Sequence, residues 1–351
     1  MDVSRSGPGL ALAAAALFGL SAPAAKLLAG AVDPWLLAGL LYSGSGIGLG
    51  LYRLAQRLLG RGGAEAPLRR QDLPWLGGAI ATGGIIGPVL LMYGLAVGTA
   101  VQSSLLLNLE GVFTALLAWT IFRESFDARI AIGMAAIAGG AVVLSWKPSE
   151  PFALGASALL VTAACLAWAI DNNLTRKVSG GDPLQIAALK GIAAGSINVL
   201  LAVVQQTPWP SVTAILGAGI VGFLGYGTSL VLFVLALRLL GTARTGAYFS
   251  TAPFLGAIAG ALALHEPLTW QISLAAALMG AGVWLHLTER HDHEHHHEAL
   301  EHTHAHLHDA HHQHSHVPGT PPGEPHSHPH VHAPLHHSHP HFPDPHHRHH
   351  H

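Results

Sequence analysis

Ten apolar stretches follow one another between Leu10 and Leu287, separated by short turns rich in Gly, Pro and Asp. An α-helix needs about 20 apolar residues to cross the hydrocarbon core of a bilayer. The pattern therefore predicts an all-α polytopic membrane protein with ten transmembrane helices. The predicted spans are Leu10–Ala29, Trp35–Leu54, Leu73–Val97, Val101–Phe122, Arg129–Trp146, Phe152–Asn172, Leu184–Val204, Val212–Leu237, Thr245–Leu264 and Thr269–Leu287.

One unit of this pattern occurs twice. Residues 108–144 read as an apolar helix, a charged turn and a second apolar helix, and residues 250–285 repeat that plan. The interval from Glu124 to Gly140 is sixteen positions, as is the interval from Glu266 to Gly282. We therefore expect two five-helix repeats, at 9–147 and 152–288. Because five is odd, the repeats are inverted across the membrane, an arrangement that places a pathway at their interface.

Basic residues indicate the orientation of the ten spans, since they favour cytoplasmic loops. One side of the predicted membrane holds only Lys26 and Lys147. The other side holds Arg5, Arg53, Arg57, Arg61, Arg69, Arg70, Arg123, Arg129, Arg176, Lys177, Arg238, Arg244 and Arg290. Both termini are predicted to be cytoplasmic.

Composition agrees with a membrane protein. Charged residues make up 10% of the chain, against roughly 25% in a soluble domain. Cys165 is the sole cysteine, which excludes a disulfide framework. The sequence has no phosphate-binding loop and no nucleophile elbow, so we expect no enzyme, no required cofactor and no nucleic-acid partner.

The beginnings of the two halves also match each other. Each first helix ends near an aromatic residue followed by a small one, and each second helix opens on Asp-Pro. The four dipeptides are Phe18-Gly19, Trp168-Ala169, Asp33-Pro34 and Asp182-Pro183. With the Glu124 and Glu266 turns and the Gly-rich closing helices, these halves resemble the EamA branch of the drug/metabolite transporter superfamily over about residues 9–288.

The resemblance implies ten helices, the cytoplasmic (inner) membrane of a prokaryote and secondary transport of small molecules, often efflux. It says nothing of substrate, direction or coupling ion, and a homodimer stays an open alternative. The family commonly has an Arg early in the second helix of a half. Leu41-Tyr42 offers none, and Lys190 can take that part in the second half only.

Glu110 is the acid nearest the middle of an apolar span. A charge at this depth costs about 2.5–3.5 kcal/mol on insertion scales, so such a group usually faces a cavity or a partner. Ser103 and Thr114 are expected on roughly the same helical face, and Asn108 precedes Glu110 by two residues. Either Glu110 exchanges a proton or cation against substrate, or it is a protonated group bonded to a neighbouring helix.

Asp171 and Asn172 are expected at the end of the sixth span, and Lys190 and Asn198 share one face of the seventh. Two interpretations remain open for the charges. Asp171 and Lys190 form an ion pair along the pathway, or Lys190 extends to the interface while Asp171 caps a loop. Glu124 and Glu266 lie in turns and are expected to be structural or gating residues.

Residues 289–351 form a polar tail that contains 26 of the 28 histidines. Its polar and Pro-rich composition predicts disorder. Imidazoles at this density bind Zn, Ni, Co or Cu, so the tail is expected to hold divalent metal. The candidate ligands are His291, His293, His295, His296, His297, His302, His304, His306 and His308.

The sequence thus predicts a secondary transporter that moves a metabolite, toxicant or metal species by alternating access, with ion or proton coupling. Its partners would be the lipid bilayer, a small-molecule or ion substrate, and metals at the tail. The alternative is a membrane anchor without transport activity, whose tail senses metal or pH. Charged residues within the spans favour the transporter.

Overall fold

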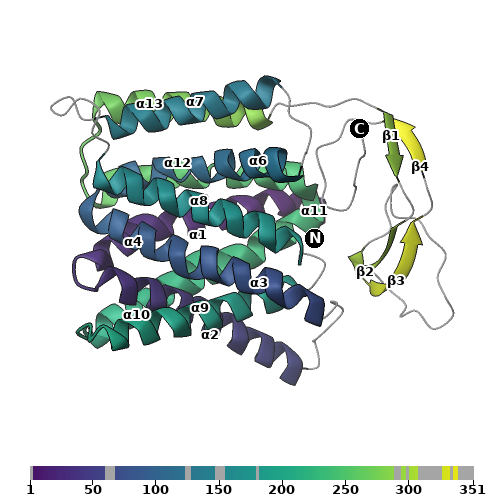
Figure 1. The fold of residues 1–351 in the computed structure, drawn as a ribbon, viewed down its shortest axis with the longest axis horizontal. Coiled ribbons are helices and arrows are strands. Elements are labelled where there is room, and N and C mark those ends of the chain that lie inside the picture. Colours follow the sequence, from purple (N-terminus) through teal and green to yellow (C-terminus); the bar gives the residue numbers. More distant parts are fainter. Residues whose placement is uncertain are drawn as a thin grey trace.

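The fold is that of a computed structural model. It describes residues 3–59, 68–122, 128–146, 155–178 and 182–287, together with the tail segments 294–297, 300–306, 326–332 and 335–338. The helical body lies in the first five of these ranges (Figure 1).

The regular elements described in the body are all helices. The first repeat comprises α1 (Val3–Ala29), α2 (Pro34–Leu58), the short 3-10 helix η1 (Arg70–Asp72), α3 (Leu73–Ala79), the π-helix η2 (Ile80–Ile86), α4 (Gly87–Val97), α5 (Ala100–Leu106), α6 (Leu109–Phe122) and α7 (Ala128–Ser145). The second comprises α8 (Ala156–Arg176), α9 (Pro183–Val204), α10 (Val212–Val221), the π-helix η3 (Gly222–Thr228), α11 (Ser229–Phe249), α12 (Ala252–Ala263) and α13 (Trp270–Leu287).

Eight helical stretches among the described residues are long and apolar enough to cross a membrane. They are Gly7–Ala29, Pro34–Leu58, Arg70–Val97, Ala100–Ile121, Ala128–Ser145, Ala156–Thr175, Pro183–Val204 and Val212–Ala236. The shorter apolar helices Ala252–Ala263 and Trp270–Leu285 follow them. Together they confirm the predicted all-helical membrane fold.

The second helix of each repeat begins in the same way. Asp33 Oδ1 accepts hydrogen bonds from the backbone N–H groups at the start of α2, and Asp182 Oδ1 does so at the start of α9. Each is followed by a proline, whose fixed φ and missing N–H suit the first helical position. The repeated Asp-Pro dipeptide is therefore a helix-start signal.

The first helix of each repeat packs against the opposite repeat. α1 contacts α11 and α12, whereas α8 contacts α4 and α6. α2 and α9 share the most extensive helix contact, and a Cβ on Gly46 or Gly191 would overlap the facing backbone. Figure 1 shows α7 and α13 together at one edge of the bundle and α2, α9 and α10 at the opposite edge. The repeats are thus interleaved.

Two charged residues outside the centre of the bundle fasten helix ends. The Glu266 carboxylate accepts hydrogen bonds from the N–H groups of Ala100 and Val101, 2.8 Å each, at the start of α5. Lys26 Nζ donates to the carbonyls of Leu95 (2.5 Å) and Gly98 (2.6 Å) at the end of α4. Both placements suit the helix dipole. Glu266 therefore stabilises the fold, whereas Glu124 lies outside the described residues.

Two helices continue beyond the ends that the sequence predicts, and both extensions bear on the site. α8 continues to Arg176, so Asp171 and Asn172 lie within a helix and not at its end. α11 continues to Phe249 through the predicted turn between the eighth and ninth spans, at 238–244. That stretch contains no proline and is rich in Leu, Arg and Ala, which favour helix.

The described tail segments form two short strand pairs. β1 (Glu294–His297) pairs antiparallel with β4 (Leu335–Ser338), and β2 (Leu300–His306) pairs antiparallel with β3 (His326–His332). The His-x-His alternation of the sequence suits the two-residue period of a strand. Each sheet has two strands among the described tail residues, and isolated two-stranded pairs are marginally stable in water. These strands lie at the same end of the bundle as the N-terminus (Figure 1).

Candidate functional site

Each repeat has a π-helical segment in its third predicted span. η2 begins at Ile80 and η3 begins at Gly222, an interval of 142 residues, which also separates Glu124 from Glu266. π-Helical turns are rare and occur frequently at functional sites, because they shift the backbone hydrogen bonds. The inverted repeats therefore place a backbone irregularity at the same position on both sides of the bundle.

The fourth span of each repeat, which is the fourth and the ninth span of the chain, is also interrupted. α5 ends at Leu106 and α6 begins at Leu109, while α11 ends at Phe249 and α12 begins at Ala252. The two interruptions are separated by 143 residues, counted from Leu106 to Phe249. Discontinuous helices in transporters with inverted repeats commonly form the substrate site.

The carbonyl groups of η2 bind side chains from three other helices. Gly83 O accepts hydrogen bonds from Trp168 Nε1 (2.9 Å) and Tyr42 Oη (2.7 Å). Gly84 O accepts one from Asn198 Nδ2 (3.1 Å). The predicted site residue Asn198 is thus fully buried against η2. This segment joins α2, α8 and α9.

Asp171 on α8 and Lys190 on α9 form an ion pair. Lys190 Nζ lies 2.6 Å from Asp171 Oδ1 and 2.7 Å from Oδ2, and it also donates to Thr175 Oγ1 at 3.3 Å. Thr175 Oγ1 donates to Asp171 Oδ1 at 2.8 Å. Side-chain exposure is 8% for Asp171 and 16% for Lys190. Of the two interpretations left open by the sequence, the structure contains the ion pair.

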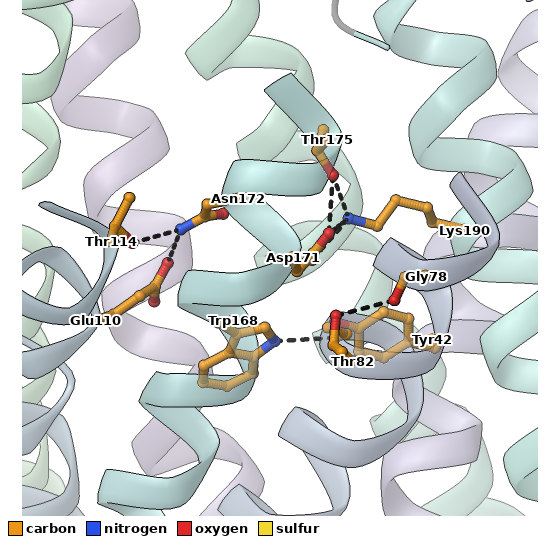
Figure 2. A network of polar contacts seen from close by, with 11 residues as sticks. Tyr42, Gly78, Thr82, Glu110, Thr114, Trp168, Asp171, Asn172, Thr175 and Lys190 are labelled. Atoms are coloured by element: carbon orange, nitrogen blue, oxygen red, sulfur yellow. Dashed lines mark hydrogen bonds and ion pairs between the residues drawn. The ribbon is translucent and has the colours of Figure 1, made fainter. Parts of the chain in front are cut away.

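Glu110 on α6 contacts α8 on the side opposite the Asp171–Lys190 ion pair. Asn172 Nδ2 donates to Glu110 Oε1 at 2.8 Å and approaches Thr114 Oγ1 at 3.4 Å. Glu110 and Thr114 are half-buried, and Asn172 is exposed. Figure 2 shows that the neighbouring residues Asp171 and Asn172 turn to opposite sides of α8. One short segment therefore connects the carboxylate of α6 with the ion pair of α9.

Four of the six predicted transport residues form the contacts on the two sides of α8: Glu110, Asn172, Asp171 and Lys190. Asn198 is bound to η2 through Gly84 O. Asn108 lies apart from them, at the α5–α6 interruption. Its Nδ2 donates to Leu105 O at 2.9 Å and lies 3.9 Å from Met279 Sδ on α13. Asn108 therefore ties the interrupted span to the second repeat.

A two-residue turn, Leu107 and Asn108, lies between Ser103 on α5 and Glu110 on α6. Ser103 is fully buried, and its Oγ has no hydrogen-bond partner among the described residues. Thr114, in contrast, lies on the same uninterrupted helix as Glu110 and shares the donor Asn172 with it.

A row of aromatic rings adjoins the polar network. Successive ring centroids are 5.5 Å apart from Tyr42 to Tyr226, 6.1 Å from Tyr226 to Phe18, 5.5 Å from Phe18 to Phe249 and 4.7 Å from Phe249 to Phe233. We call these five residues the aromatic row. All five are half-buried. Tyr42 belongs to both features, since its hydroxyl binds Gly83 O and its ring faces Tyr226.

Sequence reasoning did not identify Tyr42, Tyr226 or Gly83 as parts of a site. A tyrosine in an apolar span is usually interpreted as a core residue or as a residue at the membrane interface. The available signal was positional, because Gly83 and Gly225 are separated by 142 residues. A glycine repeated in register at the centre of a span marks a close approach in both repeats.

The predicted metal ligands fall only in part on described backbone. His295, His296 and His297 lie in β1, and His302, His304 and His306 lie in β2. His291, His293 and His308 lie outside the described residues. Among the side chains that the structure describes, no group of three or more His, Cys, Asp or Glu is placed to hold a metal ion.

Comparisons with known proteins agree with this architecture. The chain is 29% identical over 290 residues, 78% of this chain and 84% of the relative, to a protein of Methanothermobacter thermautotrophicus (strain Delta H) described as an uncharacterized transporter. A solved structure described only as "Crystal structure of protein" superposes with a TM-score of 0.59 at 19% identity, over 80% of this chain and 95% of that one, and shows the fold alone. The model of the EamA-like transporter family matches residues 5–146 and again 155–288. The chain is therefore a membrane protein that belongs to the EamA-like transporter family.

Proposed function

We propose that this chain is a secondary transporter that moves a small solute by alternating access and couples that movement to a proton or another ion at Glu110. The observation that carries the proposal is the pair of contacts made by residues 171 and 172 of α8, which we call the α8 junction. There, Asn172 binds the half-buried Glu110 carboxylate while the adjacent Asp171 binds Lys190. Charges within apolar spans mark ion and substrate pathways, and a membrane anchor needs none of them.

The two interleaved repeats are the two units whose relative movement alternating access requires. Inverted repeats can rock against each other around a site at their interface. Here the residues of the junction come from α6 of the first repeat and from α8 and α9 of the second. A movement between the repeats therefore changes the surroundings of Glu110.

Several titratable groups surround Glu110 and enter any account of its protonation. Asp171 and Lys190 act on it from α8 and α9. Tyr42 on α2 and Cys165 on α8 are also within electrostatic range. Of these groups, Glu110 is the carboxylate without a fixed cationic partner, since Lys190 is bound to Asp171. Glu110 is thus the group best suited to exchange a proton.

The test is solute-driven proton movement in proteoliposomes that contain the full chain and a trapped pH-sensitive dye. The solutes are amines, amino acids, carboxylic acids and divalent metals, each tested singly. We expect Glu110→Gln to reduce coupled proton movement at least about tenfold, because an amide takes up no proton in this range. Solute exchange without net proton movement should persist.

Asp33→Asn is the matched control, since asparagine caps a helix about as well as aspartate and Asp33 lies at the start of α2. It removes the same charge and should leave coupling unchanged. Proton movement by Glu110→Gln equal to that of the wild-type chain would exclude coupling through this residue.

The tail is part of the proposal as a metal-binding segment on the cytoplasmic side, where the distribution of basic residues predicts both termini. The described register supports this role, because it sets histidine opposite histidine. The pairs are His295 with His337, His296 with His336, His302 with His330, His304 with His328 and His306 with His326. Two imidazoles at one register position are the start of a site for Zn, Ni, Co or Cu.

We expect the full chain to bind several equivalents of Zn²⁺ at pH 7.5 and to release them as the imidazoles become protonated below about pH 6. Deletion of residues 291–351 should abolish this binding. Calorimetric titration of both forms in detergent measures it. If the chain without residues 291–351 binds as much Zn²⁺ as the full chain, the tail is not the metal-binding segment. If cells with the shortened chain tolerate metals and transport solute as well as cells with the full chain, the tail is only a spacer.

A further inference from the structure

We infer that α5 is the gate at one end of the transport pathway, and that Glu266 and Lys26 hold it shut. The inference rests on the proposed transport function and adds to it the element that opens and closes the path. Two opposing observations on α5 carry it. Charged groups from other helices and turns fasten the start of α5, whereas two of its own buried hydroxyl groups have no hydrogen-bond partner among the described residues.

The fastening acts on the turn between α4 and α5. Glu266, in the turn between α12 and α13, accepts from the N–H groups of Ala100 and Val101 with one carboxylate oxygen each. Lys26, near the end of α1, donates to two carbonyl groups at the end of α4. We call these contacts the clamp. Hydrogen bonds to charged groups are about twice as strong as neutral ones, and the bonds of Glu266 join the second repeat to the first.

The clamp lies far from the N-terminus along α1, and therefore at the end of the bundle opposite the tail strands (Figure 1). The turn that it holds connects the two elements on either side of α8. α4 continues from η2, which contains Gly83, and α5 leads through a two-residue turn to α6, which contains Glu110. Displacement of the α4–α5 turn therefore moves backbone on both sides of the α8 junction.

α5 fills the space between α12 and α8 at this end. Six of its seven residues are buried, and Gln102 is half-buried. On one side, a Cβ on Gly260 of α12 would lie 3.1 Å from Val101 N and 3.2 Å from Ala100 Cβ. On the other, Cys165 of α8 lies with Sγ 3.5 Å from the carbonyl oxygen of the last residue of α5. Water reaches Cys165 from this end only after α5 moves.

The same helix carries buried polar groups that oppose the clamp. Ser103 is fully buried and Ser104 is 1% exposed, and neither Oγ has a hydrogen-bond partner among the described residues. A hydroxyl in this state has lost its bonds to water without a replacement. A Cβ on Gly256 would lie 2.8 Å from Ser104 Oγ, so this hydroxyl faces α12. Movement of α5 away from α12 gives water access to it, which favours the open position.

The native cysteine reports the position of α5. Cys165 is fully buried and is the sole thiol of the chain. Its rate of reaction with a water-soluble maleimide, in proteoliposomes of the full-length chain, measures gate opening. We expect Glu266→Gln and Lys26→Met each to raise this rate at least about tenfold, because each removes charge-assisted hydrogen bonds of the clamp. Asp33→Asn is the matched control, since Asp33 caps α2 within its own repeat, and it should leave the rate unchanged.

The unpartnered serine gives the opposite prediction, which distinguishes a gate from a purely structural contact. Ser104→Ala removes a hydroxyl that favours the open position, so it should lower the Cys165 rate at least about threefold and slow solute exchange. A general loss of stability would raise the rate. Ser145→Ala is the control, because Ser145 Oγ is buried on α7 and donates to Ala141 O at 2.7 Å. It should not lower the rate.

A cross-link tests whether α5 must move during transport. Ala100→Cys with Gly260→Cys, in a Cys165→Ala background, joins α5 to α12. The two Cβ atoms would lie 3.2 Å apart in the closed position, slightly closer than the about 3.5–4.5 Å of a disulfide. Solute exchange in proteoliposomes should fall at least about tenfold on oxidation and recover on reduction. The Cys165→Ala chain treated with the same oxidant is the reference.

Unchanged Cys165 labelling in Glu266→Gln and Lys26→Met would overturn the inference. So would faster labelling in Ser104→Ala, or full exchange by the cross-linked chain. The proposed function fails separately. If labelling responds as expected but Glu110→Gln moves protons as the wild-type chain does, the gate stands and coupling at Glu110 is rejected. If Glu110→Gln loses coupled proton movement but neither labelling nor the cross-link has an effect, the transporter stands and the gate is rejected.

Discussion

Lys190→Met is expected to lower the free energy of unfolding by about 3–5 kcal/mol, because it leaves the buried Asp171 carboxylate without its cation. The Lys190 ammonium group binds both oxygens of that carboxylate and the hydroxyl of Thr175. Removing it strands a charge inside an apolar helix pair. Denaturant titration in detergent measures the loss, and Arg57→Met, on the exposed end of α2, should stay within about 0.5 kcal/mol of the parent.

The double variant Asp171→Asn with Lys190→Met carries neither charge and should recover much of that stability, since an unpaired buried charge is the costly state. The coupling energy of the cycle should be at least about 2 kcal/mol. Transport should nevertheless be absent from Asp171→Asn, from Lys190→Met and from the double variant. Additive losses in the single and double variants would show that the two residues act independently, and the pair would then not organise the α8 junction.

Gly83→Ala is expected to reduce solute-driven proton movement at least about tenfold, because overpacking costs about 1–3 kcal/mol and about 1.4 kcal/mol corresponds to a factor of ten. The added methyl group would overlap the Asp171 carboxylate. To make room, Asp171 or η2 must move, which disturbs the ion pair and the carbonyl that Tyr42 and Trp168 bind.

Gly77→Ala is the control, because a Cβ on Gly77 of the preceding helix α3 has no atom within 4 Å. The same substitution there should preserve transport and slightly favour the helix. If Gly83→Ala transports as well as the wild-type chain, the close contact between η2 and α8 has no part in the cycle.

The sequence was sufficient to predict the helical architecture and the charged members of the site. Spans of about 20 apolar residues leave little choice of structure in a bilayer. Within such spans Glu110, Asp171 and Lys190 stand out, because an unpaired charge there is costly. The geometry of their pairing depends on helix packing, which a single sequence does not specify. The ion pair could therefore be proposed but not distinguished from an interfacial lysine.

Other parts of the site depend on irregular backbone, for which the sequence pattern carries little information. The π-helical turn of η2 determines how Gly83 O and Gly84 O meet Tyr42, Trp168 and Asn198. The interruption after Leu106 lies between Ser103 and Glu110, in a stretch that the apolar pattern predicts as one continuous helix. In both cases packing overrides the regular period of 3.6 residues per turn.

The interleaving of α1 and α8 also means that the repeats are not separable polypeptides. Each first helix covers the interior of the other repeat, so a chain cut between α7 and α8 would give two fragments with complementary uncovered surfaces. The helices that contact each first helix most extensively lie in the other fragment. The two fragments would have to insert together and exchange those helices before either half of the bundle was complete. The assembly of this protein therefore requires both repeats to be present in the membrane at the same time.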